Sequence, residues 1–293
     1  MSVSDWFSTF CSNLRIQNTD TISARYKRIT RRLNLDFWGT DSEVSHSLYV
    51  GSYGRNTAIA GLSDLDMLFE LPNSVYHQYN EHIGNGQSAL LQAVRNSISG
   101  TYTTTNIGAD GQVVQVPFTD GITFEVLPAF INKDGVTYTH PDSNNGGSWK
   151  VTDPKTEIEA IRSRNTACNG NLVRLCRMMR AWKNEWSVPM KSMLIDTLAY
   201  QFIIDWGYRD RSFLYYDWMC RDFFKFMAEQ DLNQEYWVAP GSGRYVYGKG
   251  AFQHKARRCY NLAIEAIDNE GKGYHYTAKE NWRDIFGTAC FPS

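Results

Sequence analysis

The feature that most constrains the fold is a strand carrying two aspartates on one face. Residues 51–71 are GSYGRNTAIAGLSDLDMLFEL and end in an apolar run that contains Asp64 and Asp66. Successive side chains of a strand point to opposite faces, so the two aspartates share one face and the apolar side chains take the other. Their backbone positions lie about 7 Å apart. Two carboxylates at that range repel each other, and a fold that places them beside a core must offset the repulsion.

The residues alone leave two interpretations of the aspartate pair open. A divalent cation would offset the repulsion, since hard Mg²⁺ takes oxygen ligands and keeps positions open for a substrate phosphate. Alternatively, Asp64 and Asp66 project into water at the end of the strand.

The Gly51-Ser52 pair follows an apolar, strand-like run and opens a tight loop rich in small residues. Glycine lets backbone N–H groups approach a phosphate closely, and the serine hydroxyl adds a donor. A phosphate cradle next to a carboxylate pair is what metal-assisted phosphoryl or nucleotidyl transfer requires. An ordinary turn is the alternative interpretation of this loop.

Glu125 lies in an otherwise apolar segment, ITFEVLPAF. Ile122, Phe124 and Val126 share one face of the predicted strand, so Glu125 points to the other. A third carboxylate would complete a two-metal site together with the aspartates. The alternative is a charge on an edge strand that faces water.

Composition narrows the possible functions. The chain has 293 residues, 42% of them hydrophobic, and a formal net charge of −1, so no global positive field indicates a nucleic-acid-binding protein. The six cysteines form no C-x-x-C pair and the six histidines show no metal-ligand spacing, so we interpret the thiols as reduced and structural. No signal-peptide pattern and no apolar run of about 18 residues is present, so we expect a cytoplasmic protein without a membrane contact.

The first half of the chain mixes helix and strand signals. Helical spacing of apolar residues predicts helices over 3–36 and 87–99. The basic residues within ISARYKRITRRLNL form either a solvated face or a contact to a polyanion. Strands are expected at 47–52, 65–71, 102–107, 113–118 and 122–130, with a hairpin turn at 108–112 and a surface loop at 139–149.

The second half of the chain is predicted to be helical. The predicted domains are residues 1–155, including the N-terminal helix, and residues 156–293. The segment 241–258 is locally basic and aromatic, and we favour a surface loop leading into a helix over a nucleic-acid contact. Helices are expected over 155–165, 171–186, 192–206, 217–230 and 254–270.

Two arginines stand out in the helix over 171–186. An apolar stripe runs along this helix at spacings of 3 and 4, and Arg177 and Arg180 lie on a face away from it. That face can look across a cleft between the domains or lie at the surface, and for Arg177 we favour the surface. The stripe consists of Leu172, Leu175, Met179, Trp182 and Trp186.

The order Val50-Gly51-Ser52, eleven intervening residues and Asp64-Leu65-Asp66-Met67 resembles the DNA-polymerase-β-type nucleotidyltransferases. More narrowly, the chain is similar to the bacterial CD-NTases (SMODS type), relatives of cyclic GMP–AMP synthase and oligoadenylate synthetase. The likeness extends through ARYKRITRRLN, FEVLPAF, the W-x-VTDP junction, RMMRAWKNEW with MKSMLID, and the C-terminal W-x-x-x-FG. It implies an α+β fold of two lobes, a polymerase-β-like nucleotidyltransferase lobe and an oligoadenylate-synthetase-like helical lobe, with the active site in the cleft between them.

The resemblance also implies roles for individual residues. Asp64 and Asp66 match the metal-binding aspartates, and Glu125 matches the third acidic position, where the family usually has Asp. Gly51 and Ser52 match the turn that touches the donor triphosphate.

Further triphosphate contacts are implied in the helical half. Arg180 stands where the family usually places a phosphate-contacting Lys, a change that keeps the charge and alters the donor geometry. Ser192, in the pair Lys191-Ser192, matches the second triphosphate contact.

The implied reaction uses NTP substrates and two Mg²⁺ ions, for which Mn²⁺ can substitute, held by the three carboxylates. A ribose hydroxyl attacks the donor α-phosphorus, pyrophosphate leaves, and a second transfer closes a cyclic di- or trinucleotide second messenger. In the family this product activates a separate effector protein in anti-phage defence. The chain lacks the Cys/His cluster with which DNA-sensing animal relatives hold zinc, so we expect no DNA requirement, and we expect a monomer.

Two other functions stay open. One is a nucleotidyltransferase acting on an RNA end or a small molecule, although a near-neutral charge argues against a long RNA substrate. The other is a non-catalytic nucleotide-binding relative, against which the intact Asp64/Asp66 pair argues.

Overall fold

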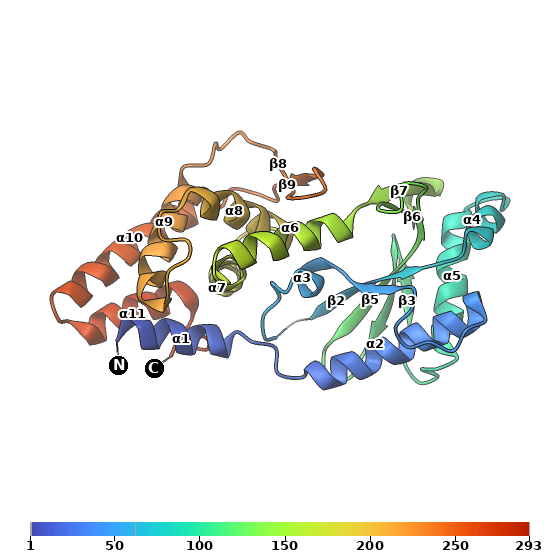
Figure 1. Cartoon of the computed structure of the whole chain (residues 1–293), viewed down its shortest axis with the longest axis horizontal. Coiled ribbons are helices and arrows are strands. Elements are labelled where there is room, and N and C mark those ends of the chain that lie inside the picture. Colours follow the sequence, from blue (N-terminus) through green and yellow to red (C-terminus); the bar gives the residue numbers. More distant parts are fainter. Residues whose placement is uncertain (1, 62, 293) are drawn as a thin grey trace. The chain divides into compact units, whose positions relative to one another are not determined.

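The computed structural model describes residues 2–61 and 63–292, and these form two compact units (Figure 1). The sheet unit comprises residues 17–55 and 61–158. The helical unit comprises residues 1–16, 56–60 and 159–293. Each unit is built around its own buried side chains, so we describe them separately.

The sheet unit contains a mixed sheet in the order β1-β2-β5-β4-β3, which β6 and β7 extend from β5. β2 runs parallel to β5, and the other pairs are antiparallel. Its elements are α2 (Thr19–Leu33), the π-helix η1 (Asn34–Trp38), β1 (Ser47–Tyr49), α3 (Gly51–Gly54), β2 (Asp64–Glu70), α4 (Asn73–Asn80), α5 (Gly86–Ser99), β3 (Gly108–Asp110), β4 (Val113–Pro117), β5 (Thr123–Ile131), β6 (Tyr138–Asp142), the 3-10 turn η2 (Asn144–Gly146), β7 (Ser148–Thr152) and the start of α6 (Pro154–Ala167).

One face of this sheet is fully buried at its centre. Leu65, Met67 and Phe69 of β2 are inaccessible to solvent, as are Phe124 and Val126 of β5 beside them. Helix α5 lies against β3, β4 and β6 (Figure 1). Its apolar side chains at helical spacing, Leu90, Leu91, Val94 and Ile98, are buried. The predicted alternation of both strands is confirmed.

Two local predictions in the sheet unit are wrong. Residues 102–107 form turns and no strand, because the strand begins only at Gly108 and the chain reverses at Gly111, whose φ is +58°. The segment 139–149, expected as a loop, instead forms most of the hairpin of β6 and β7, and only residues 143–147 form its turn. The polar residues of this segment favour a loop, but the segment forms a strand because β6 pairs with the end of β5.

The basic residues of α2 are largely paired with acids. Arg25 bonds Asp120, while Arg31 and Arg32 pair with Asp41 and Asp36. Most of the positive charge of this helix is therefore balanced locally, which favours the solvated-face interpretation over a polyanion contact.

The helical unit buries an aromatic cluster that includes the N-terminal helix. Phe7 of α1 packs edge-to-face on Trp282 and Phe291, and Phe10 packs on Phe286 at a centroid distance of 4.7 Å. Its elements are α1 (Val3–Asn13), the rest of α6, α7 (Asn171–Glu185), α8 (Ser192–Asp205), the 3-10 turn η3 (Phe213–Tyr215), α9 (Tyr216–Ala228), the hairpin β8 (Tyr236–Val238) and β9 (Tyr245–Tyr247), α10 (Gln253–Gly271) and α11 (His275–Phe286).

This cluster explains why residues 1–16 belong with the helical unit, whereas the sequence assigned them to the first domain. The segment 241–258, expected as a loop and the start of a helix, also contributes strand β9. The cysteines among the described residues form no disulfide, and all but Cys290 are buried. Within residues 2–61 and 63–292, the structure contains no helix of the length and apolarity needed to cross a membrane.

Candidate active site

The acidic residues of the sheet unit form a row on the face opposite the core. In the parallel register of β2 and β5, Asp66 lies directly beside Glu125. On the other side of β5, Gln115 lies beside Glu125 and donates a hydrogen bond from Nε2 to its Oε1 at 3.1 Å. Strand β5 has neighbours on both sides, so the edge-strand interpretation of Glu125 is wrong. Asp64, at the exposed start of β2, continues the row.

The Gly51-Ser52 turn packs directly on this row. The backbone N–H of Val50 bonds the carbonyl of Asp66 at 3.0 Å. Gly51 has a φ of +59°, and a Cβ at that position would stand 1.8 Å from Oδ2 of Asp66. Only glycine therefore allows the turn and the Asp66 carboxylate to approach so closely. Two motifs separated by eleven residues thus meet at one point, and Ser52 follows immediately in the short helix α3.

The row gathers negative charge that Arg55 offsets only in part. Burial, together with the neighbouring carboxylates of Glu125 and Asp64, raises the pKa of Asp66 to about 6, although Arg55 acts in the opposite direction. Ionising Asp66 is therefore costly in the sheet unit alone. A strongly perturbed carboxyl beside two others is typical of a functional site.

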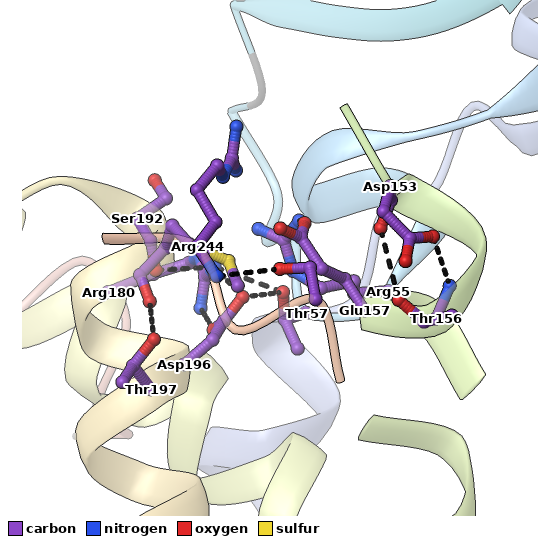
Figure 2. Close-up of polar contacts among 12 residues, drawn as sticks. Arg55, Thr57, Asp153, Thr156, Glu157, Arg180, Ser192, Asp196, Thr197 and Arg244 are labelled. Atoms are coloured by element: carbon purple, nitrogen blue, oxygen red, sulfur yellow. Dashed lines mark hydrogen bonds and ion pairs between the residues drawn. The ribbon is translucent and has the colours of Figure 1, made fainter. Parts of the chain in front are cut away.

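Arg55 is a site residue that the sequence analysis missed. Its side chain is 6% exposed and pairs with buried Glu157 of α6 at 3.7 Å (Figure 2). Its charge favours ionised Asp66, as noted above. The only signal in the sequence was a lone arginine among the small residues of GSYGRNTA, which did not indicate burial.

The carboxylate row fits a hard divalent cation by its donor chemistry. It offers carboxylate oxygens only, the ligands that Mg²⁺ prefers, and it holds negative charge that a cation would balance. Among the described residues, however, no group of three or more His, Cys, Asp or Glu side chains converges closely enough to hold a metal. Oδ2 of Asp64 instead accepts a bond from Ser63 at 3.0 Å. Metal binding would therefore require the side chains of the row to reorient.

Arg180 is buried inside the helical unit, contrary to the expectation that it lies on an open face. Helix α7 is buried on nearly all sides, which the apolar stripe alone did not reveal. The guanidinium makes two bonds to the Asp196 carboxylate, at 2.7 and 2.9 Å, and donates to Thr57 at 3.0 Å (Figure 2). It also bonds the carbonyl of Ser192 at 3.3 Å. In this arrangement Arg180 fixes the start of α8, and its predicted phosphate contact stays a prediction.

The other residues predicted to touch the triphosphate belong to different units. Ser52 lies in the sheet unit beside the row, whereas Lys191 and Ser192 lie at the start of α8 in the helical unit. Lys191 is exposed and Ser192 is half-buried. The structure thus brings together Gly51, Asp66 and Glu125, and separately Arg180 and Ser192.

Comparisons with known proteins agree with this architecture. Residues 1–165 match the family described as the Second Messenger Oligonucleotide or Dinucleotide Synthetase (SMODS) domain. A probable cyclic nucleotide synthase of Bacillus cereus is 24% identical over 279 residues, covering 83% of this chain and 81% of the relative. E. coli CdnC, solved with ATP, superimposes with a TM-score of 0.69 at 14% identity, covering 99% of both chains. The CD-NTase CdnG of Bradyrhizobium diazoefficiens, solved with GTP, gives 0.67 at 11% identity, covering 99% of this chain and 96% of CdnG.

The sheet unit with its carboxylate row and the helical unit have the fold of these CD-NTase structures. The matches to the SMODS domain and to a cyclic nucleotide synthase identify the chain as a nucleotidyltransferase. Because the SMODS match spans more than half of its residues, the chain belongs to that family, the bacterial CD-NTases.

Proposed function

We propose that this enzyme joins NTPs into a cyclic di- or trinucleotide by metal-assisted nucleotidyl transfer. The observation that carries the proposal is the contact of the Gly51 turn with Asp66, which lies in turn beside Glu125. A turn suited to a phosphate and a row of carboxylates suited to a divalent cation are thereby adjacent, as nucleotidyl transfer requires.

In the proposed reaction a ribose hydroxyl of the acceptor attacks the α-phosphorus of the donor NTP. The new O–P bond forms as the bond to pyrophosphate breaks, and the hydroxyl proton passes to Glu125. Gln115 orients Glu125 for this role by holding its Oε1. Asp64, Asp66 and Glu125 would hold Mg²⁺, which when bound lowers the pKa of the hydroxyl and offsets the charge of the triphosphate. Ser52 donates to the donor triphosphate, and a second transfer of the same kind closes the ring.

A phosphatase-protection assay tests the proposal. Purified protein is incubated with four NTPs, each α-³²P-labelled in turn, with Mg²⁺ or Mn²⁺, and the mixture is treated with phosphatase before chromatography. A labelled product that resists phosphatase, and that is absent with Asp64→Asn and with Asp66→Asn, is the expected result. The label pattern would also identify the bases.

Other outcomes would select the alternatives. A labelled, phosphatase-resistant product that forms only when an RNA or a small-molecule acceptor is added would indicate transfer to that acceptor, because such a transfer also makes a phosphodiester that phosphatase does not cleave. Tight NTP binding without product under either metal would favour a non-catalytic nucleotide-binding relative.

The proposed biological role is the production of a signal that a separate effector protein reads during phage infection. The similarity of the chain to a probable cyclic nucleotide synthase supports the production of such a nucleotide signal. Extracts of infected cells expressing the wild-type protein should contain the cyclic product, and extracts with Asp66→Asn should not.

A further inference from the structure

A pocket of about 270 Å³ lies within the helical unit, between α1 and α7. One wall comes from Ser8, Cys11 and Ser12 of α1 and from Arg15, just after its end. Ser8, Cys11 and Ser12 share one face of the helix because they lie three and four positions apart, and Arg15 lines the same pocket. None of them belongs to the predicted donor contacts.

The opposite wall is also basic. Arg174 and Arg177, three residues apart on α7, line the pocket together with Phe213. Three guanidinium groups therefore gather around one small cavity. Burial of the Cys11 thiol raises its pKa to about 12, and all three arginines act against that rise, which is consistent with their convergence on Cys11.

Among the described residues, Arg174 and Arg177 have no carboxylate among their contacts. Arg174 donates from Nη1 to the carbonyl of Asn169 and to Asn171 and Tyr216, and it lies 5.2 Å from the centroid of the Phe213 ring. Arg177 donates from Nη2 to Oδ1 of Asn56 at 2.6 Å. Its Nε is buried and has no hydrogen-bond partner within residues 2–61 and 63–292.

This arrangement is electrostatically unfavourable without an anion. Burial lowers the pKa of Arg177, and the positive charge of Arg15 lowers it further. A buried N–H without a partner costs about 1–3 kcal/mol, so a ligand that accepts bonds here would relieve both penalties. Guanidinium forks and serine hydroxyls match the oxygens of a tetrahedral phosphate group.

We infer that this pocket binds a small phosphate-bearing molecule, held by Arg15, Arg174 and Arg177. The size of the pocket suits inorganic pyrophosphate or a similarly small phosphate ester rather than a polymer. The inference does not depend on the chemistry proposed for the carboxylate row.

Isothermal titration with inorganic pyrophosphate tests the inference. The titration is run at low ionic strength with EDTA present, because chelation removes the divalent cations through which the carboxylate row would hold a phosphate. We expect saturable binding of one pyrophosphate, weakened at least about tenfold by Arg177→Gln, since each lost charge-assisted bond is worth about that factor. Arg15→Gln should weaken binding similarly, and Arg15 is exposed, so this variant keeps the test valid if Arg177→Gln fails to fold.

Two control variants separate this pocket from other anion contacts. Arg162→Gln removes an exposed arginine of the same unit whose partner is Glu159, and it should leave binding unchanged. Ser52→Ala removes the predicted donor contact and should also leave binding unchanged. Absence of binding to the wild-type protein would overturn the inference. An equal loss with Arg162→Gln, or a loss with Ser52→Ala but not with Arg15→Gln, would overturn it as well.

Discussion

The raised pKa of Asp66 predicts how the stability of the sheet unit depends on pH. A carboxyl with a pKa of about 6 in the folded state and 3.8 otherwise binds its proton more tightly when folded. The proton bound to Asp66 therefore stabilises the folded state fully below pH 4, and this stabilisation is lost as the pH rises from about 4 to 6. At pH 7.5 the ionised carboxylate destabilises the metal-free sheet unit by about 3 kcal/mol, since each pKa unit corresponds to about 1.4 kcal/mol.

Asp66→Asn removes this charge while keeping the shape of the side chain. In EDTA at pH 7.5 it should raise the melting temperature, by roughly 5–10 °C for a unit of this size, and the gain should shrink towards pH 4. Mg²⁺ should stabilise the wild-type protein and leave Asp66→Asn nearly unaffected. Differential scanning calorimetry across pH 4–8 measures all three effects.

Asp217 provides a matched control. Burial raises its pKa to about 6 too, and it lies on α9 in the helical unit. Asp217→Asn should stabilise the protein with the same pH dependence but should keep the response to Mg²⁺. A lower melting temperature for Asp66→Asn in EDTA at pH 7.5, or a gain that does not depend on pH, would refute the electrostatic reasoning.

Two further substitutions test the packing of the site. Gly51→Ala places a methyl group against the Asp66 carboxylate and should abolish product formation and lower the free energy of unfolding by about 2 kcal/mol or more. Gly135 has a similar positive φ but no atom within 4 Å of an added Cβ, so Gly135→Ala should lower the free energy of unfolding by only about 1 kcal/mol in a urea titration. Equal losses for the two glycine variants would contradict the contact between Gly51 and Asp66. Arg180→Ala removes the ion pair with the buried Asp196 carboxylate and should cost about 3–5 kcal/mol by the same titration. If Arg180→Ala loses activity but keeps the free energy of unfolding of the wild-type protein, the result would instead favour the predicted phosphate contact of Arg180.

The sequence predicted the acidic row because strand alternation is a local property. Leu65 and Met67 had to take the face opposite to Asp64 and Asp66, and the same reasoning placed Glu125. The position of Gly51 against Asp66 could be suspected only from the family resemblance, since nothing local specifies which turn meets which strand.

The predictions that failed depend on long-range packing. Arg180 was placed on an open face because periodicity gives the most apolar side of a helix and not the extent to which its other sides are covered. Burial of Arg180 depends on Asp196 and Thr57, which come from α8 and from the loop after α3. The N-terminal helix joined the helical unit because Phe7 packs on aromatic residues near the C-terminus, a pairing that no local pattern encodes.

Pyrophosphate release tests the central claim most directly. Wild-type protein and Asp66→Asn are compared with NTPs and Mg²⁺ at a temperature where calorimetry shows that both are folded. The account predicts pyrophosphate release by the wild-type protein, in step with the phosphatase-resistant product, and release at background level by Asp66→Asn. Equal release by the two proteins would contradict the assignment of the carboxylate row as the site of nucleotidyl transfer.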